Sequence, residues 1–149
     1  MRALLLSAIA IAGLTTLAGL APLRAEDMPS DAEVAAHEAV LDLAGAFTND
    51  GFKLRDGNYS GALKTGQSAM VQVNLYAGNQ YWFSVATADP KTTVSLALYD
   101  ESGKAVKADP YTDAHRAAAG FSPDNSGPYY VKISNAGPAA IFCLIYSYK

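Results

Sequence analysis

The sequence predicts a mainly β protein, an antiparallel sandwich or barrel of about eight short strands preceded by one amphipathic α-helix. From Gly51 onward, apolar and polar residues alternate with a period of two, and turns rich in Gly, Pro, Asn and Asp recur between the alternating runs. No helical pattern separates these runs, and parallel neighbours need long crossover connections. We therefore expect antiparallel pairing throughout.

The first 25 residues have the layout of a secretory signal peptide. Arg2 supplies positive charge, residues 3–23 carry none, and the small residue Ala25 precedes Glu26. An uncleaved membrane anchor is the alternative, but Gly13 and Pro22 interrupt the apolar run as a continuous helix. We expect cleavage after Ala25, no stable membrane insertion afterwards, and a secreted or periplasmic protein. The remaining chain divides into an N-terminal helical segment over residues 26–50 and a β domain over residues 51–149.

The composition of the mature chain argues against several classes of partner. Removing residues 1–25 takes away two arginines and no acid, which leaves nine basic and fourteen acidic residues and a net charge of −5. An acidic domain has no electrostatic attraction to nucleic acid or to anionic lipid. Cys143 is the only cysteine, so no internal disulfide can form. We interpret it as a core residue between Phe142 and Leu144, with a nucleophile or an intermolecular bridge as alternatives.

The segment before Gly51 has the signals of a capped helix over residues 31–47. Ser30 and Glu33 form a capping-box pattern, and residues 49–51 provide a stop signal. The helical spacing predicts one apolar stripe made of Ala36, Val40, Leu43, Ala44 and Phe47. Asp31, Glu38 and Asp42 share the opposite face. That acidic face is either solvated or meets a basic partner.

The strands are expected in chain order over residues 52–54, 59–63, 70–75, 81–85, 94–98, 104–107, 116–121, 129–134 and 139–148, with a looser stretch over 108–115. The first two are expected to flank a turn at residues 56–58. In the strand after Gly127, Tyr129 and Val131 point to the core and Tyr130 and Lys132 point away from it. The last strand is apolar on both faces, which is typical of a central, covered strand. We expect the helix to cover it, over an open end or edge of the sandwich.

Four stretches resemble successive strands of the bacterial pre-peptidase C-terminal domain: residues 66–67, 77–85, 94–103 and 126–133. The resemblance implies a jelly-roll-like β-sandwich and an exported, non-catalytic module. Members of that family accompany secreted proteases and other hydrolases, and some bind collagen or polysaccharide, in certain cases with Ca²⁺. The resemblance transfers no calcium ligand to a particular position of this chain.

The residues themselves predict binding rather than catalysis. The chain has no Gly-x-Ser-x-Gly, no His-Glu-x-x-His and no phosphate-binding loop, so we expect no enzyme and no catalytic residue. We expect no cofactor or metal site; the one candidate for Ca²⁺ is the acid set Asp100, Glu101, Asp109 and Asp113, which lacks EF-hand spacing.

The candidate ligand-binding residues are Trp82, Tyr99 and Tyr130, which point away from the inner face of their strands, and Lys132 beside them. The alternative is that these aromatics stabilise the sheet or lie under the helix. We expect a binding module that recognises a protein or polysaccharide. The alternative function is a structural or assembly subunit that docks on an exported complex through its acidic helix.

Overall fold

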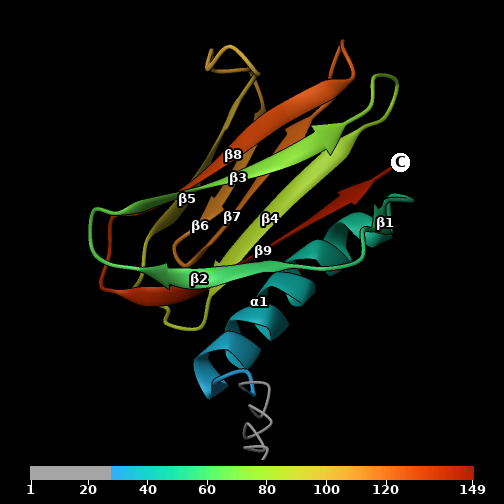
Figure 1. The fold of residues 1–149 in the computed structure, drawn as a ribbon. Helices are drawn as coiled ribbons and strands as arrows, with labels where there is room; N and C mark the ends of the chain where they lie inside the picture. The colour runs from blue at the N-terminus through green and yellow to red at the C-terminus, as the bar shows by residue number, and fades with distance from the viewer. Residues whose placement is uncertain (1–27) are drawn as a thin grey trace, which may run out of the picture.

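The computed structural model describes residues 28–149, so the predicted signal peptide over residues 1–25 lies outside the described part. The chain there forms one helix and two packed antiparallel sheets (Figure 1), which confirms the predicted sandwich behind a helix. The elements are α1 (Asp31–Thr48), β1 (Lys53–Leu54), β2 (Tyr59–Leu63), β3 (Ser68–Leu75), β4 (Tyr81–Thr87), β5 (Val94–Tyr99), β6 (Asp109–Asp113), β7 (Arg116–Phe121), β8 (Gly127–Asn135) and β9 (Ala140–Tyr148). No helix in these residues has the length and apolarity to cross a membrane.

The strand order is that of a jelly roll. The large sheet has the order β1-β9-β4-β7-β6, with β2 also paired to β9, and the small sheet has the order β3-β8-β5. Consecutive strands from β2 to β5, and again from β7 to β9, alternate between the two sheets. The last two strands are each inserted between earlier ones, β8 between β3 and β5 and β9 between β2 and β4.

The main core fills the space between the two sheets. Phe83 on β4 and Leu144 on β9 face Val131 and Ile133 on β8, and all four side chains are fully buried. Tyr129 belongs to the same cluster. The alternation predicted for β8 is therefore confirmed.

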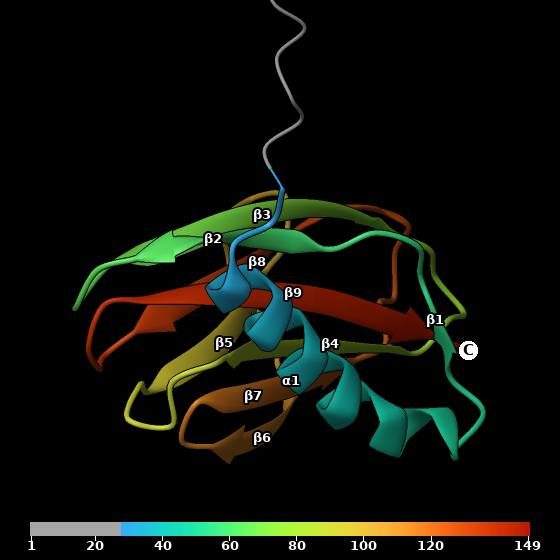
Figure 2. The same ribbon diagram turned by 90° about the horizontal axis from the view of Figure 1, so that it is seen from below.

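Helix α1 begins at the predicted capping box, in which the Ser30 hydroxyl accepts from the Glu33 amide and the Glu33 carboxylate accepts from the Ser30 amide. Its buried stripe packs on the outer face of the large sheet, as the view from below shows (Figure 2). Ala36 and Val40 contact Cys143 and Ile145 there in a second apolar cluster.

The helix thus buries the second apolar face of β9, as predicted, but its expected position over an open end or edge was wrong. It crosses the middle of the large sheet because β9 is an interior strand and its outer face can be covered only there.

Three local predictions also differ from the structure. Residues 104–107 contribute a single bridge, Tyr99 to Ala105, instead of a strand. The stretch expected to be loose forms β6, which pairs with β7. Segments β1 and β2 both pair with β9 and not with each other. For β1 and β2 the partner is β9, which is distant in sequence, whereas β6 pairs with the next strand, β7, across a short turn that local turn signals did not reveal.

Candidate binding surfaces

The four predicted binding residues lie on opposite faces of the sandwich. Trp82 projects from β4 on the outer face of the large sheet, because its neighbours Tyr81 and Phe83 point into the core. Tyr99, Tyr130 and Lys132 project from the outer face of the small sheet. The structure therefore brings three of the four residues together and separates Trp82 from them.

Trp82 is packed by the helix instead of forming an open platform. Its ring is stacked on Phe47 of α1, with centroids 4.3 Å apart and planes 9° apart. The indole also lies against Gly120, its cross-strand partner on β7, where an added Cβ would come within 2.9 Å of the indole Cζ2. With Phe47 and Gly120 in contact with the indole, little of the ring is left for stacking on a ligand. The alternative in which the helix covers an aromatic residue thus describes Trp82.

Tyr99 and Tyr130 are direct cross-strand partners on the small sheet, and Gln72 on β3 is the partner of Tyr130 on its other side. The next row along the same face contains Ala97, Lys132 and Met70 in the same order. Both tyrosines are half-buried, so their rings present a partly open, flat surface. Lys132 is the only charged residue in the three strands of this sheet. We call this surface the tyrosine face.

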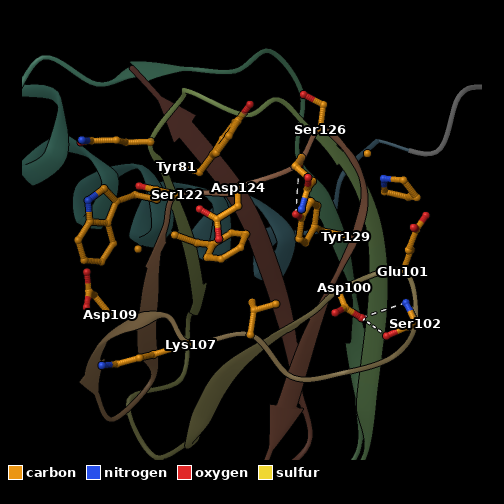
Figure 3. A pocket seen from close by; sticks show the side chains of 18 of the residues that line it. Tyr81, Asp100, Glu101, Ser102, Lys107, Asp109, Ser122, Asp124, Ser126 and Tyr129 are labelled. Carbon is orange, nitrogen blue, oxygen red and sulfur yellow. Dashed lines mark hydrogen bonds between the residues drawn. The ribbon is translucent and has the colours of Figure 1, made fainter.

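A cleft of about 730 Å³ opens at the end of the sandwich where the tyrosine face stops (Figure 3). Asp100, Glu101 and Ser102 directly follow Tyr99 and line it, and residues 126–129 directly precede Tyr130 and also line it. The remaining lining residues come from the residue before β1, from the start of β4, from the start of β6 and the segment before it, and from the end of β7 with the β7–β8 connection: Phe52, Gln80, Tyr81, Trp82, Val106, Lys107, Asp109, Gly120, Phe121, Ser122, Asp124 and Asn125. The rim of the cleft therefore adjoins the tyrosine face along the chain, although Tyr99 and Tyr130 themselves are not among the lining residues.

Hydrogen bonds within the protein hold several cleft groups in place. The Asp100 carboxylate accepts from the Ser102 amide at 2.9 Å, from the Ser102 hydroxyl at 2.6 Å and from the Lys104 amide at 3.0 Å. These bonds, that of the Ser102 hydroxyl first, lower the pKa of Asp100 below its ordinary value. Gly103, at φ +80°, supplies the left-handed turn that this loop needs. Asp100 is thus a structural residue of the cleft rim.

The tyrosine hydroxyls in the cleft are similarly engaged. The Tyr129 hydroxyl donates to the Asn125 carbonyl at 2.9 Å, and the Tyr81 hydroxyl accepts from the Tyr76 amide at 2.9 Å. The side chains of Glu101, Lys107, Asp109 and Asp124 occupy exposed positions on the lining. These four, unlike Asp100, are charged groups of the lining that are available to a ligand with hydrogen-bonding or charged ends.

The acid set considered for Ca²⁺ is divided by the fold. Asp100, Glu101 and Asp109 line the cleft, whereas Asp113 lies at the β6–β7 turn and accepts a short hydrogen bond from Arg116. That bond lowers the pKa of Asp113. Within residues 28–149, no group of three or more His, Cys, Asp and Glu side chains is placed to hold a metal ion.

Cys143 lies under the helix, fully buried, and burial raises the pKa of its thiol. A buried thiol with a raised pKa is a poor nucleophile, since the thiolate is the reactive form. The interpretation as a packing residue therefore fits the structure, and this position offers neither chemistry nor a bridge on the surface.

Sequence reasoning missed the cleft residues Tyr81, Asp124 and Asn125. A signal for the last two was present, because residues 122–128 form a long turn of Ser, Pro, Asp, Asn and Gly between two strands. Loops of that kind at the end of a sandwich often carry function. Comparisons with profiles of known protein families and with curated protein sequences gave no match.

Proposed function

We propose that this protein is an exported, non-catalytic binding module that recognises a polysaccharide or protein partner where the tyrosine face meets the end cleft. The observation that carries the proposal is the adjacency of the two surfaces: Tyr99 directly precedes the cleft rim residues Asp100 to Ser102, and residues 126–129 of the lining directly precede Tyr130. A polymer lying across the tyrosine pair toward this end of the sandwich would reach the cleft rim. The resemblance to the pre-peptidase C-terminal domain agrees with a role of this kind.

The chemistry of the joined surface favours a polysaccharide. Flat aromatic rings stack on the apolar faces of sugars, and carboxylates accept hydrogen bonds from sugar hydroxyls. Glu101, Asp109 and Asp124 supply such acceptors in the cleft. The cleft volume of about 730 Å³ lies within the roughly 300–1,000 Å³ typical of ligand sites.

Export is part of the same proposal and has its own test. The charge and apolar pattern of residues 1–25 supports cleavage after Ala25. Mass spectrometry of the protein recovered from the extracellular or periplasmic fraction should give an N-terminus at Glu26. Recovery of the uncut chain in the membrane fraction would contradict this part of the proposal.

Ligand binding is tested with a glycan array, followed by affinity electrophoresis in the best-retained polysaccharide and by pull-down from the native extracellular fraction. Tyr99→Ala and Tyr130→Ala should each weaken retention roughly tenfold, the scale expected for an aromatic anchor. Tyr111→Ala is the matched control, because Tyr111 is an exposed tyrosine on β6 in the other sheet. Unchanged retention by folded Tyr99→Ala and Tyr130→Ala variants would refute this site.

One feature of α1 supports the second candidate, an assembly subunit. Val34 and Leu41, exposed to 43% and 38%, form one outer stripe with Asp31 and Glu38. Glu38→Lys combined with Leu41→Lys should abolish capture of a protein partner in pull-down if this stripe docks on an exported complex. Ala46→Lys, at an exposed helix position off the stripe, is the control. If the Glu38→Lys/Leu41→Lys variant captures the partner as well as the Ala46→Lys control does, the stripe is not the docking site.

A further inference from the structure

The two sides of the sandwich end in edge strands of different character. On one side β6 contains Pro110, which lacks an amide donor, and two aspartates. Its neighbour β5 is covered by the segment that follows it, through the Tyr99–Ala105 bridge and the hydrogen bond from the Val106 amide to the Leu98 carbonyl. Proline, charge and cover are the usual devices that prevent an edge from pairing with another chain.

The opposite side, formed by β2 and β3, has none of these devices. Strand β3 pairs with β8 without interruption from Ser68 to Leu75, and among residues 28–149 no strand pairs with its other edge. It contains no proline, no charge and no bulge over eight residues. Residues 57–88, which include β2, β3 and β4, contain one charged residue, Lys64.

The side chains at this edge are also incompletely covered. Met70 on the outer face of β3 is 56% exposed, the largest exposed fraction of any large apolar side chain in the strands. On the inner face, Ala69 and Val71 touch the core but are only partly buried. A further strand along β3 would cover all three residues and satisfy the outward backbone groups.

We propose that β3 pairs antiparallel with β3 of a second copy of this chain, so that two small sheets join into one six-stranded sheet across a two-fold axis. The partner strand must place apolar residues toward the core and uncharged residues outward, in phase with β3. Strand β3 has that pattern itself. With the axis at Gln72, each Val71 would face Val73 of the other copy and each Met70 would face Asn74, and no charged residue would meet another.

A second copy fits this edge better than an unrelated acidic or basic strand for an electrostatic reason. The acids of the described chain lie outside residues 57–88, on α1, around the cleft and in other loops, so the net negative charge does not gather at β3. An isologous contact joins identical patches, and an uncharged patch such as β3 does this without placing like charges opposite each other.

The test is the oligomeric state of the purified protein by sedimentation equilibrium, without polysaccharide. Wild type should form a dimer. Met70→Lys/Gln72→Lys and Met70→Glu/Gln72→Glu should each raise the dimer dissociation constant roughly tenfold or more, because the two charges at position 72 would face each other across the axis and each charge at position 70 would lie diagonal to the partner's charge at 72. An equal mixture of the two variants should form the heterodimer with affinity near that of wild type.

The mixing experiment separates self-pairing from other causes, since only residues that face their own copy can be rescued by opposite charge. Thr93→Lys/Ser95→Lys introduces the same charge at exposed positions at and before β5, away from the β3 edge, and should leave the dimer unchanged. Circular dichroism and thermal melting check that all variants fold. A monomeric wild type at the highest soluble concentration, or equal association in both charge variants and no heterodimer in the mixture, would overturn the proposal.

Discussion

The ring of Phe47 is stacked on the indole of Trp82, with centroids 4.3 Å apart and planes 9° apart. Phe47 is the last apolar residue of the helix stripe, and Trp82 lines the end cleft. One aromatic pair therefore fixes the C-terminal end of α1 to the sheet and forms part of a cleft wall. Because Trp82 is the only tryptophan of the chain, its fluorescence reports on both the attachment of the helix end and the cleft wall.

Replacing Phe47 should loosen the end of the helix. We expect Phe47→Ala to lower the free energy of unfolding by about 2 kcal/mol, less than for a fully buried Phe because Phe47 is half-buried. The Trp82 emission should shift to longer wavelength as water reaches the indole. Denaturant unfolding followed by circular dichroism and fluorescence measures both. Val34→Ala, an exposed change on the same helix, should stay within about 0.5 kcal/mol of wild type; equal effects of the two changes would contradict the stack.

Gly120 has no side chain, so it leaves room for the Trp82 indole. Any other residue would place a Cβ in that space. In Gly120→Ala the new Cβ would lie 2.9 Å from the Trp82 Cζ2, and we expect a loss of about 1–3 kcal/mol in the free energy of unfolding. Trp82→Phe removes the crowded part of the ring, so the same Gly120→Ala change should cost at least about 1 kcal/mol less in that background. The double-mutant cycle is measured by denaturant unfolding.

Gly45 provides the contrast, because nothing lies within 4 Å of the position of its added Cβ. Gly45→Ala should stabilise the helix by about 0.5–1 kcal/mol. A Gly120→Ala change that behaves like Gly45→Ala would show that the indole is not held against β7.

The two faces of α1 should respond oppositely to one substitution. Val40 is fully buried against Ala86 and Ile145, whereas Val34 is 43% exposed. We expect Val40→Asp to cost at least about 3 kcal/mol, since it places a carboxylate between helix and sheet. Val34→Asp should change stability by no more than about 0.5 kcal/mol. Thermal and denaturant unfolding give the values, and similar results for both variants would show that the helix does not pack on the sheet.

Stability should fall in alkali because two buried groups ionise less readily in the folded protein. Burial raises the pKa of Cys143 above its ordinary value of 9.0 and that of Tyr146 above 10.0. A raised folded pKa means that the contribution to stability is complete below the unfolded pKa and is lost as pH rises through the folded one. The free energy of unfolding should therefore decrease from about pH 9 upward.

Cys143→Ala should reduce the part of this decrease that begins near pH 9 and leave the part due to Tyr146. Denaturant midpoints at pH 7, 9 and 10.5 measure the effect. In the native protein at pH 8, a thiol reagent should modify Cys143 far more slowly than in denaturant. A fast native reaction would mean that the helix does not cover the thiol.

Local signals accounted for much of the secondary structure. The capping box at Ser30 and Glu33 marked the start of the helix correctly, and the period of two placed Val131 and Ile133 in the core. The two apolar faces of β9 correctly indicated an interior strand covered by α1. Each of these inferences depends on residues close together in the sequence or on the alternation of apolar and polar residues, and both can be seen in the sequence itself.

Strand pairing, both between distant segments and across the β6–β7 turn, was the part that local reasoning misjudged. The sequence favoured a strand over residues 104–107 and a loose stretch before Arg116, whereas the structure pairs β6 with β7. The Asp113–Arg116 hydrogen bond spans the β6–β7 turn, and Ala114 adopts φ +45° there. A non-glycine residue in that conformation is uncommon, so turn composition alone could not indicate the hairpin.

The sequence by itself determined which residues face the core, where the helix begins and that Tyr99 and Tyr130 point outward, because these follow from local periodicity and capping. Only the tertiary structure decided that Tyr99 lies beside Tyr130, that Trp82 lies beneath Phe47, and that a cleft opens beyond the tyrosines. The physical reason is the jelly-roll order. It inserts the last two strands between earlier ones, so the neighbours of each outward side chain are set by pairing across the whole chain.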